Sequence, residues 1–82
     1  MREVIVGKTY KHFKGHIVKV LCIAKNTETL EKEVVYEHLG SKDIWARPYD
    51  MFNSLVDKNK YPDVTQKYRF EEIDEWDRRY HC

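Results

Sequence analysis

The chain has 82 residues, of which 15 are basic and 14 acidic, for a formal net charge of +1. A chain of this length can build one hydrophobic core, and it buries roughly 60% of its unfolded surface. A content of 41% apolar and 13% aromatic residues excludes a disordered or fibrous chain. The near-neutral charge argues against a generally basic nucleic-acid binder, and no apolar run is long enough to cross a membrane. We therefore expect residues 1–82 to form one small globular domain.

The N-terminal part of the chain predicts two strands. Residues 4–10 are rich in β-branched side chains and favour a first strand, followed by a turn at residues 11–15 in which Gly15 takes a positive φ angle. Residues 16–24 carry apolar side chains on both phases, which is typical of a central strand with both faces partly covered. Residues 26–29, Asn-Thr-Glu-Thr, have side chains that bond their own backbone and predict a loop.

A β-hairpin is expected in the middle of the chain. Residues 33–39 form one strand, residues 40–43 supply a turn of hairpin length, and residues 44–47 form the second strand. Pro48 should end that strand, because proline has no N–H to donate to the ladder.

The C-terminal part is less regular. Residues 49–56 allow a short helical turn with Met51, Phe52 and Leu55 facing inward, and residues 57–63 form a polar loop. Residues 66–70 predict a closing strand, while the tail after residue 73 is compatible with strand or helix. Several short strands joined by brief turns indicate a mainly β fold, a small antiparallel β-barrel with a short helical turn and an uncertain C-terminal tail.

Four segments together resemble one known family: residues 10–15, 20–29, 34–36 and 45–52. The last contains the most specific element, Trp-x-Arg-Pro-x-x-Met-Phe, and an Arg-Phe pair follows at residues 69 and 70. In this order the segments are similar to the DUF1653 family of small bacterial proteins, over about residues 7–73. The resemblance implies an SH3-like β-barrel of uncharacterised function and leaves residues 74–82 as a tail without a counterpart.

Catalytic and metal-binding patterns are weak. Cys22 lies between Leu21 and Ile23, which implies burial and an inert thiol, and no nucleophile with a base and an orienting group can be assembled. His12 and His16 lie four residues apart across a glycine turn, which is not the paired spacing of a zinc site. We expect no enzyme activity and no cofactor. The two cysteines form no disulfide framework, and the N-terminus lacks a signal-peptide core, so a cytoplasmic location with free thiols is expected.

The most informative candidate for binding is the segment that contains Trp45 and Arg47, which alternation places on the same strand face. If Ile44 and Ala46 fill the interior, Trp45 and Arg47 lie outside, where a ring and a guanidinium can stack on a ligand or grip an anion. If the phase is reversed, Trp45 is a core residue. The leading hypothesis is a non-enzymatic module that recognises a protein or peptide through an aromatic and arginine surface. Its candidate binding residues are Trp45, Arg47, Pro48, Tyr49, Phe52, Tyr10, His12 and Phe13.

The alternative hypothesis is binding of a nucleic acid or nucleotide. Residues 1–25 contain an excess of basic side chains, and aromatic residues lie near the predicted turns. Basic groups that contact phosphate and rings that stack on bases are the two components of single-strand recognition. The lysines considered for this role are Lys8, Lys11, Lys14 and Lys19.

Overall fold

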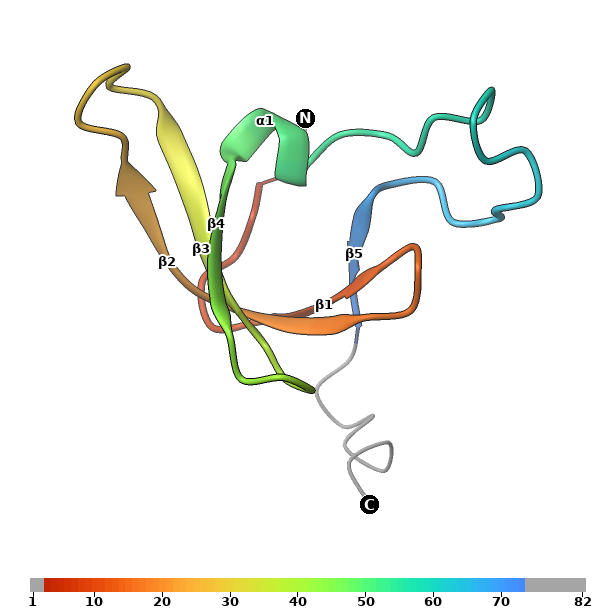
Figure 1. Ribbon diagram of the computed structural model, residues 1–82, viewed down its shortest axis with the longest axis horizontal. Helices are drawn as coiled ribbons and strands as arrows, with labels where there is room; N and C mark the ends of the chain where they lie inside the picture. Colours follow the sequence, from red (N-terminus) through yellow and green to blue (C-terminus); the bar gives the residue numbers. More distant parts are fainter. Residues whose placement is uncertain (1–2, 74–82) are drawn as a thin grey trace.

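The computed structural model describes residues 3–73, which form one antiparallel sheet and a short helix (Figure 1). The strands follow the order β4-β3-β2-β1-β5 across the sheet. This confirms the mainly β prediction. The elements are β1 (Thr9–His12), β2 (Ile17–Lys25), β3 (Lys32–His38), β4 (Ile44–Pro48), α1 (Tyr49–Phe52) and β5 (Phe70–Glu72).

The sheet is curved but open, so closure into a barrel is not confirmed. Within residues 3–73, β4 and β5 are the two edge strands and do not pair with each other. Figure 1 shows these strands standing opposite each other across the bend of the sheet. The connection between α1 and β5 pairs with itself instead: Leu55 bridges Tyr68, Val56 N–H donates to the Lys67 carbonyl, and Arg69 N–H donates to the Ser54 carbonyl.

The first strand begins later than the sequence predicts. Val4 and Ile5 are not in the ladder, because their N–H groups donate to the hydroxyls of Tyr49 and Tyr10, each at 2.9 Å. Pairing with β2 starts at Thr9 and the strand continues to His12, inside the segment expected to be a turn. Side-chain hydroxyls thus satisfy the backbone donors of a β-branched segment that was expected to pair as a strand.

A β-bulge explains the apolar residues on both phases of β2. The register with β3 shifts between Val20 and Cys22, so Leu21 is the extra residue. Val20 faces inward before the bulge, and Ile23 pairs with the buried Val34 after it. Leu21 and Cys22 are both exposed, so the expected burial of Cys22 and of a second sheet face is wrong. Two consecutive outward residues are what an inserted residue produces.

The positive φ angle predicted for Gly15, the predicted loop at residues 26–29 and the predicted hairpin are confirmed. Gly15 has a φ angle of 99°, in the region that glycine adopts without strain. In the loop after β2, the Asn26 side-chain oxygen accepts hydrogen bonds from the N–H groups of Glu28 and Thr29. Strands β3 and β4 form the antiparallel hairpin, in which Tyr36 lies opposite Trp45.

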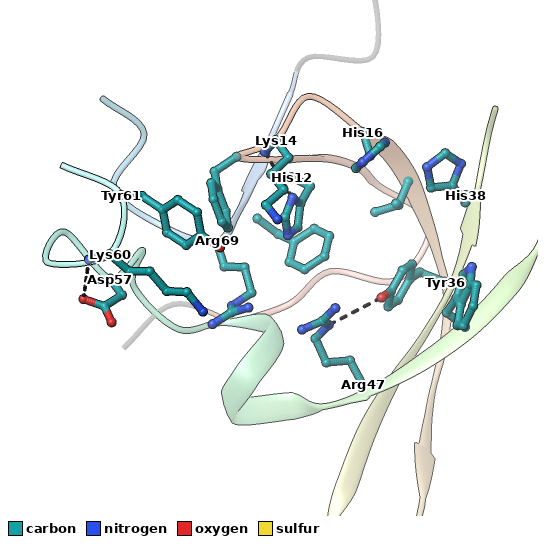
Figure 2. Close-up of a pocket in the computed structure, with 14 residues that line it drawn as sticks. His12, Lys14, His16, Tyr36, His38, Arg47, Asp57, Lys60, Tyr61 and Arg69 are labelled. Carbon is teal, nitrogen blue, oxygen red and sulfur yellow. Dashed lines mark hydrogen bonds between the residues drawn. The ribbon is translucent and has the colours of Figure 1, made fainter. Parts of the chain in front are cut away.

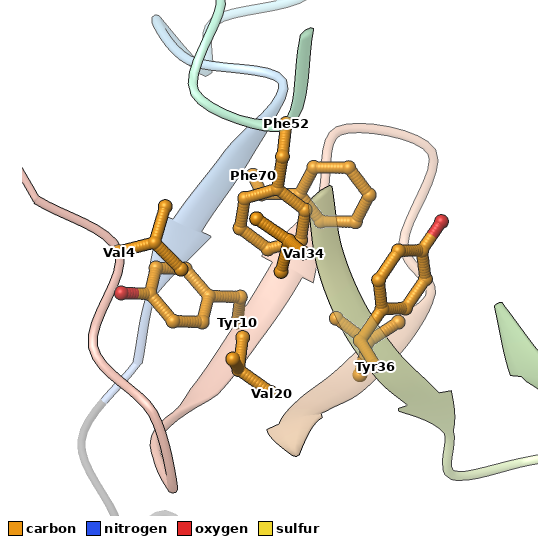
Figure 3. Close-up of a cluster of buried hydrophobic side chains, with 8 residues drawn as sticks. Val4, Tyr10, Val20, Val34, Tyr36, Phe52 and Phe70 are labelled. Carbon is orange, nitrogen blue, oxygen red and sulfur yellow. The ribbon is translucent and has the colours of Figure 1, made fainter. Parts of the chain in front are cut away.

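The core lies between the inner face of the sheet and α1 (Figure 3). Phe52 is fully buried and stacks on Phe70, with ring centroids 4.1 Å apart and planes nearly parallel. Met51 and Leu55 are 47% and 57% exposed, so their expected inward position is wrong. Because α1 is a single turn, it directs Phe52 inward, and Val56 fills the core after the helix ends.

Candidate ligand-binding pocket

Part of the inner sheet face belongs to the hydrophobic core, and the rest lines a pocket of about 590 Å³. Strand β1 contributes His12, β3 contributes Tyr36 and His38, and β4 contributes Trp45 and Arg47. The facing wall comes from two other segments: residues 57–61 and the residues just before β5. The remaining lining residues are Phe13, Lys14, His16, Val18, Asp57, Lys60, Tyr61, Arg69 and Phe70.

Trp45 and Arg47 lie on the inner face of the sheet. In the register they lie opposite Tyr36 and Val34, which are both core residues. Ile44 and Ala46 are exposed, so of the two phases considered for this strand the one that places these two residues in the interior is wrong. Trp45 is nevertheless not sealed in the core: the residue is 55% exposed on the edge strand β4. The indole is therefore on the core face and still accessible.

Arg47 is held at the boundary between the core and the pocket. Its Nε donates to the Tyr36 hydroxyl at 3.4 Å, and its guanidinium carbon lies 5.7 Å from the centre of the Phe70 ring. Arg69 is fixed in turn by a hydrogen bond from its Nε to Ser54 Oγ at 3.2 Å. Figure 2 shows the charged ends of Arg47, Arg69 and Lys60 turned toward the same side of the pocket. Three separate segments thus bring positive charge to one place.

The lysines of the pocket lie against aromatic rings. Lys14 Nζ is 5.5 Å from the centre of the Tyr61 ring and 6.0 Å from that of Phe13. Lys60 Nζ is 5.8 Å from the Tyr61 ring on the same wall. Phe13 and Tyr61 contact each other, with centroids 4.9 Å apart. Cation–π contacts of this kind hold an ammonium group without neutralising its charge.

Acidic groups are scarce in the pocket. Among the described lining residues, Asp57 is the single carboxylate against two lysines and two arginines. Its Oδ1 accepts hydrogen bonds from the backbone N–H groups of Asn59 and Lys60, at 3.0 and 3.4 Å. That carboxylate therefore serves the turn of its own loop, and the pocket keeps an excess of positive charge.

Two of the three imidazoles have a defined neutral tautomer. Nδ1 of His12 accepts the N–H of Lys14 at 3.1 Å, and Nδ1 of His38 accepts the N–H of Ser41 at 3.2 Å. An accepting Nδ1 leaves the hydrogen of a neutral ring on Nε2. Burial lowers the pKa of His12 to about 4, and the electrostatic influence of Arg47, His16, Arg69 and Lys14 acts in the same direction. At neutral pH, His12 is thus an uncharged donor.

The histidines do not form a metal centre with the described part of the chain. Ring centroids are 6.0 Å apart for His12 and His16 and 4.9 Å apart for His16 and His38. Within residues 3–73, no three His, Cys, Asp or Glu side chains are grouped closely enough to hold a metal ion.

The structure brings together half of the residues predicted to bind. Trp45, Arg47, His12 and Phe13 line the pocket. Tyr10 and Phe52 are core residues, so the expectation that Phe52 belongs to an exposed patch is wrong. The Tyr49 hydroxyl accepts the N–H of Val4, and Pro48 is exposed at the end of β4, outside the pocket lining.

The lysines considered for phosphate contact divide in the same way. Of the four N-terminal lysines, Lys14 reaches the pocket, and Lys8, Lys11 and Lys19 do not line it. On β5, Glu71 accepts the N–H groups of Lys67 and Tyr68 and so holds the chain before this strand. The strand or helix expected for the tail after residue 73 lies outside the described residues.

Several lining residues were missed by the sequence analysis. A signal existed for His38, because it follows the inward-facing Tyr36 by two positions on β3. His16 directly precedes β2, in phase with the buried Val18. No local pattern distinguishes Lys60, Tyr61 and Arg69, which come from the long connection after α1 and reach the pocket through tertiary folding.

The fold and the pocket define a small antiparallel β domain with a cationic, aromatic-lined cavity beside its core. A family model described as a protein of unknown function (DUF1653) matches residues 8–72. The chain therefore belongs to the DUF1653 family, as the sequence resemblance implied. No curated protein and no solved structure matches it. None of the helical structure in residues 3–73 is long and apolar enough to cross a bilayer.

Proposed function

We propose that this chain is a non-enzymatic binding module that holds an anionic group of its ligand in the pocket. The observation that carries the proposal is the environment of the four basic side chains. Lys14, Lys60 and Arg47 lie over aromatic rings, and Arg69 is bonded to a serine hydroxyl. Rings and hydroxyls position these groups while leaving their charge available. An arginine fork offers parallel donors to a phosphate or carboxylate, which strengthens the attraction.

A binding role is favoured over catalysis by the position of the reactive groups. Cys22 is exposed on the outer face of the sheet, opposite to the side that lines the pocket. The Asp57 carboxylate is engaged by its own loop, and Nδ1 of His12 is occupied by a backbone N–H. A nucleophile, a base and an orienting group would have to converge on one point for covalent catalysis.

A protein partner remains the second candidate, supported by the edge strand β4. Ile44 is 64% exposed and Trp45 55% exposed on this strand, and an edge strand offers unpaired backbone groups to a peptide. A peptide that pairs with β4 would be displaced by substituting Ile44→Lys and would be insensitive to Arg69→Gln.

The proposed function is tested by calorimetric titration of the full chain with inorganic phosphate and pyrophosphate. We expect binding that Arg47→Gln and Arg69→Gln each weaken at least about tenfold, since a charge-assisted hydrogen bond contributes roughly 1.5–3 kcal/mol. Lys19→Gln is the matched control, because Lys19 is exposed on β2 and does not line the pocket. Absence of anion binding, or an equal loss in the Lys19 variant, would contradict the proposal.

A further inference from the structure

The pocket places an accessible ring beside a positive charge on one strand. Trp45 and Arg47 are two residues apart on the inner face of β4, so their Cα atoms are separated by about 6.6–7 Å. More than half of Trp45 is exposed at the edge of the sheet. A ligand that uses both groups must carry a planar ring at a short distance from an anion.

The opposite wall adds charge near the same guanidinium. In Figure 2 the ends of Lys60 and Arg69 approach the pocket from the side that faces Arg47. These cations come from β4, from the loop after α1 and from the segment before β5. Convergence of three cations suits a group with several anionic oxygens, such as a phosphate, better than a single carboxylate.

The neutral donors of the pocket also favour an acceptor-rich ligand. Because Nδ1 of His12 and of His38 accepts a backbone N–H, Nε2–H is the group that each neutral ring can offer. Base carbonyls, ring nitrogens and phosphate oxygens are all acceptors. A volume of about 590 Å³ lies within the usual range of small-molecule sites, roughly 300–1,000 Å³.

Building on the proposed function, we propose that the pocket binds a nucleotide, free or as one unit of a single strand, with its base stacked on Trp45 and its phosphate held by Arg47, Arg69 and Lys60. A phosphopeptide would use the cations alone and leave the indole without a planar partner. Stacking on an aromatic side chain is tolerant of base identity, because every base presents a π face. The site is therefore expected to distinguish nucleotides from inorganic phosphate more strongly than one base from another.

The experiment is a calorimetric titration of the full chain with four probes: inorganic phosphate, nucleoside 5′-monophosphates, ten-residue oligo-U and oligo-dT, and a phosphoserine peptide. We expect the monophosphates to bind at least tenfold more tightly than inorganic phosphate. In a Trp76→Phe background, in which Trp45 is the remaining tryptophan, we expect nucleotides to quench the fluorescence and inorganic phosphate to leave it unchanged. An oligonucleotide that binds more tightly than the monophosphates, with a steep salt dependence, identifies a single strand as the ligand, and equal affinities identify the free nucleotide.

Substitution of the Trp45 indole distinguishes nucleotide recognition from simple anion binding. Trp45→Ala should weaken nucleotide binding roughly 5- to 150-fold, which corresponds to the roughly 1–3 kcal/mol that one stacked base contributes, and leave the affinity for inorganic phosphate unchanged. Trp45→Phe should restore part of the loss, and thermal melting of each variant verifies that it is folded. If Trp45→Ala does not change the ratio of nucleotide to phosphate affinity, or if the phosphopeptide binds more tightly than the nucleotides, the inference is overturned while the anion-binding function stands. Failure of all four probes would overturn both.

Discussion

The two ends of the inner sheet face have the same strand alternation but opposite properties. At one end Val20, Val34 and Tyr10 lie beneath Phe52 of α1 and form the core. At the other end His12, His38 and Trp45 follow the same inward phase and line an accessible pocket. The difference lies in what faces them: the buried Phe52 ring of α1 packs on one end, whereas Lys60 and Tyr61 of a polar loop line the pocket at the other. Alternation therefore defines which face is inner, and the segment that faces it decides whether that face becomes core or site.

The largest expected effect is at the covered end. Phe52 is fully buried and stacked on Phe70, so Phe52→Ala should lower the free energy of unfolding by about 3–5 kcal/mol through lost burial and a cavity. Urea denaturation followed by circular dichroism measures this loss. Met51→Ala on the same helical turn is the control and should change stability by less than about 1 kcal/mol, because Met51 is exposed. Equal losses would show that the helical turn, rather than its buried ring, makes the core.

A second, smaller effect concerns pH and the pocket end. The pKa of His12 is about 4 in the fold and near 6.5 when unfolded, so folding favours the neutral ring. The resulting stabilisation is complete above pH 6.5 and is lost as pH falls toward 4, because the unfolded state then binds more protons. With allowance for solvent screening of a half-exposed ring, we expect a contribution of about 1 kcal/mol. Urea denaturation of His12→Gln and of the native chain across pH 4–7 measures the contribution of His12 to the free energy of unfolding. If the free energies of the two proteins fall in parallel as the pH is lowered, the predicted contribution is contradicted.

Tyr36 contacts both the core and the pocket, so its substitution tests the two ends of the sheet face at once. The Tyr36 ring packs on Phe52 and Phe70 in the core, and its hydroxyl accepts the hydrogen bond of Arg47. Tyr36→Phe keeps the ring, so it should reduce stability by no more than about 1 kcal/mol. Anion affinity should fall several-fold, because Arg47 loses its fixed orientation. If calorimetry shows undiminished affinity, the hydroxyl does not position the guanidinium.

The smallest stability effect is expected at the exposed indole. Trp45→Ala should change the free energy of unfolding by about 0.5 kcal/mol or less, since the residue is largely accessible. A loss comparable with that of Phe52→Ala would assign Trp45 to the core and remove the distinction between the two ends.

Local signals were sufficient for much of the sheet. Strands β2, β3 and β4 and the turns between them follow from β-branched residues, from Asn26 and from the hairpin spacing. The first strand was misplaced because two tyrosine hydroxyls accept the N–H groups of Val4 and Ile5: one belongs to Tyr49, 45 residues away, and the other to Tyr10, within the predicted strand itself. The β-propensity of residues 4–6 is high, but propensity does not indicate which acceptor will bind the backbone N–H groups.

The pocket was predictable only on its sheet side. Trp45 and Arg47 were found through alternation, although the inner face proved to be theirs and not that of Ile44 and Ala46. The facing wall depends on how residues 53–69 fold back, including the pairing of Leu55 with Tyr68. These contacts are made by residues distant from β4 in sequence. The periodic pattern around Trp45 therefore does not predict the facing wall of the pocket.

The bulge in β2 has a consequence for chain length. Leu21 is the inserted residue, so removing it would bring Val20, Cys22 and Ile23 into regular in-out-in alternation. Deleting Lys19 instead would move the side chains on one side of the deletion to the opposite face of the sheet and expose part of the core. Strand β2, the longest strand within residues 3–73, therefore contains a position at which deletion of one residue would preserve the alternation of inward and outward side chains.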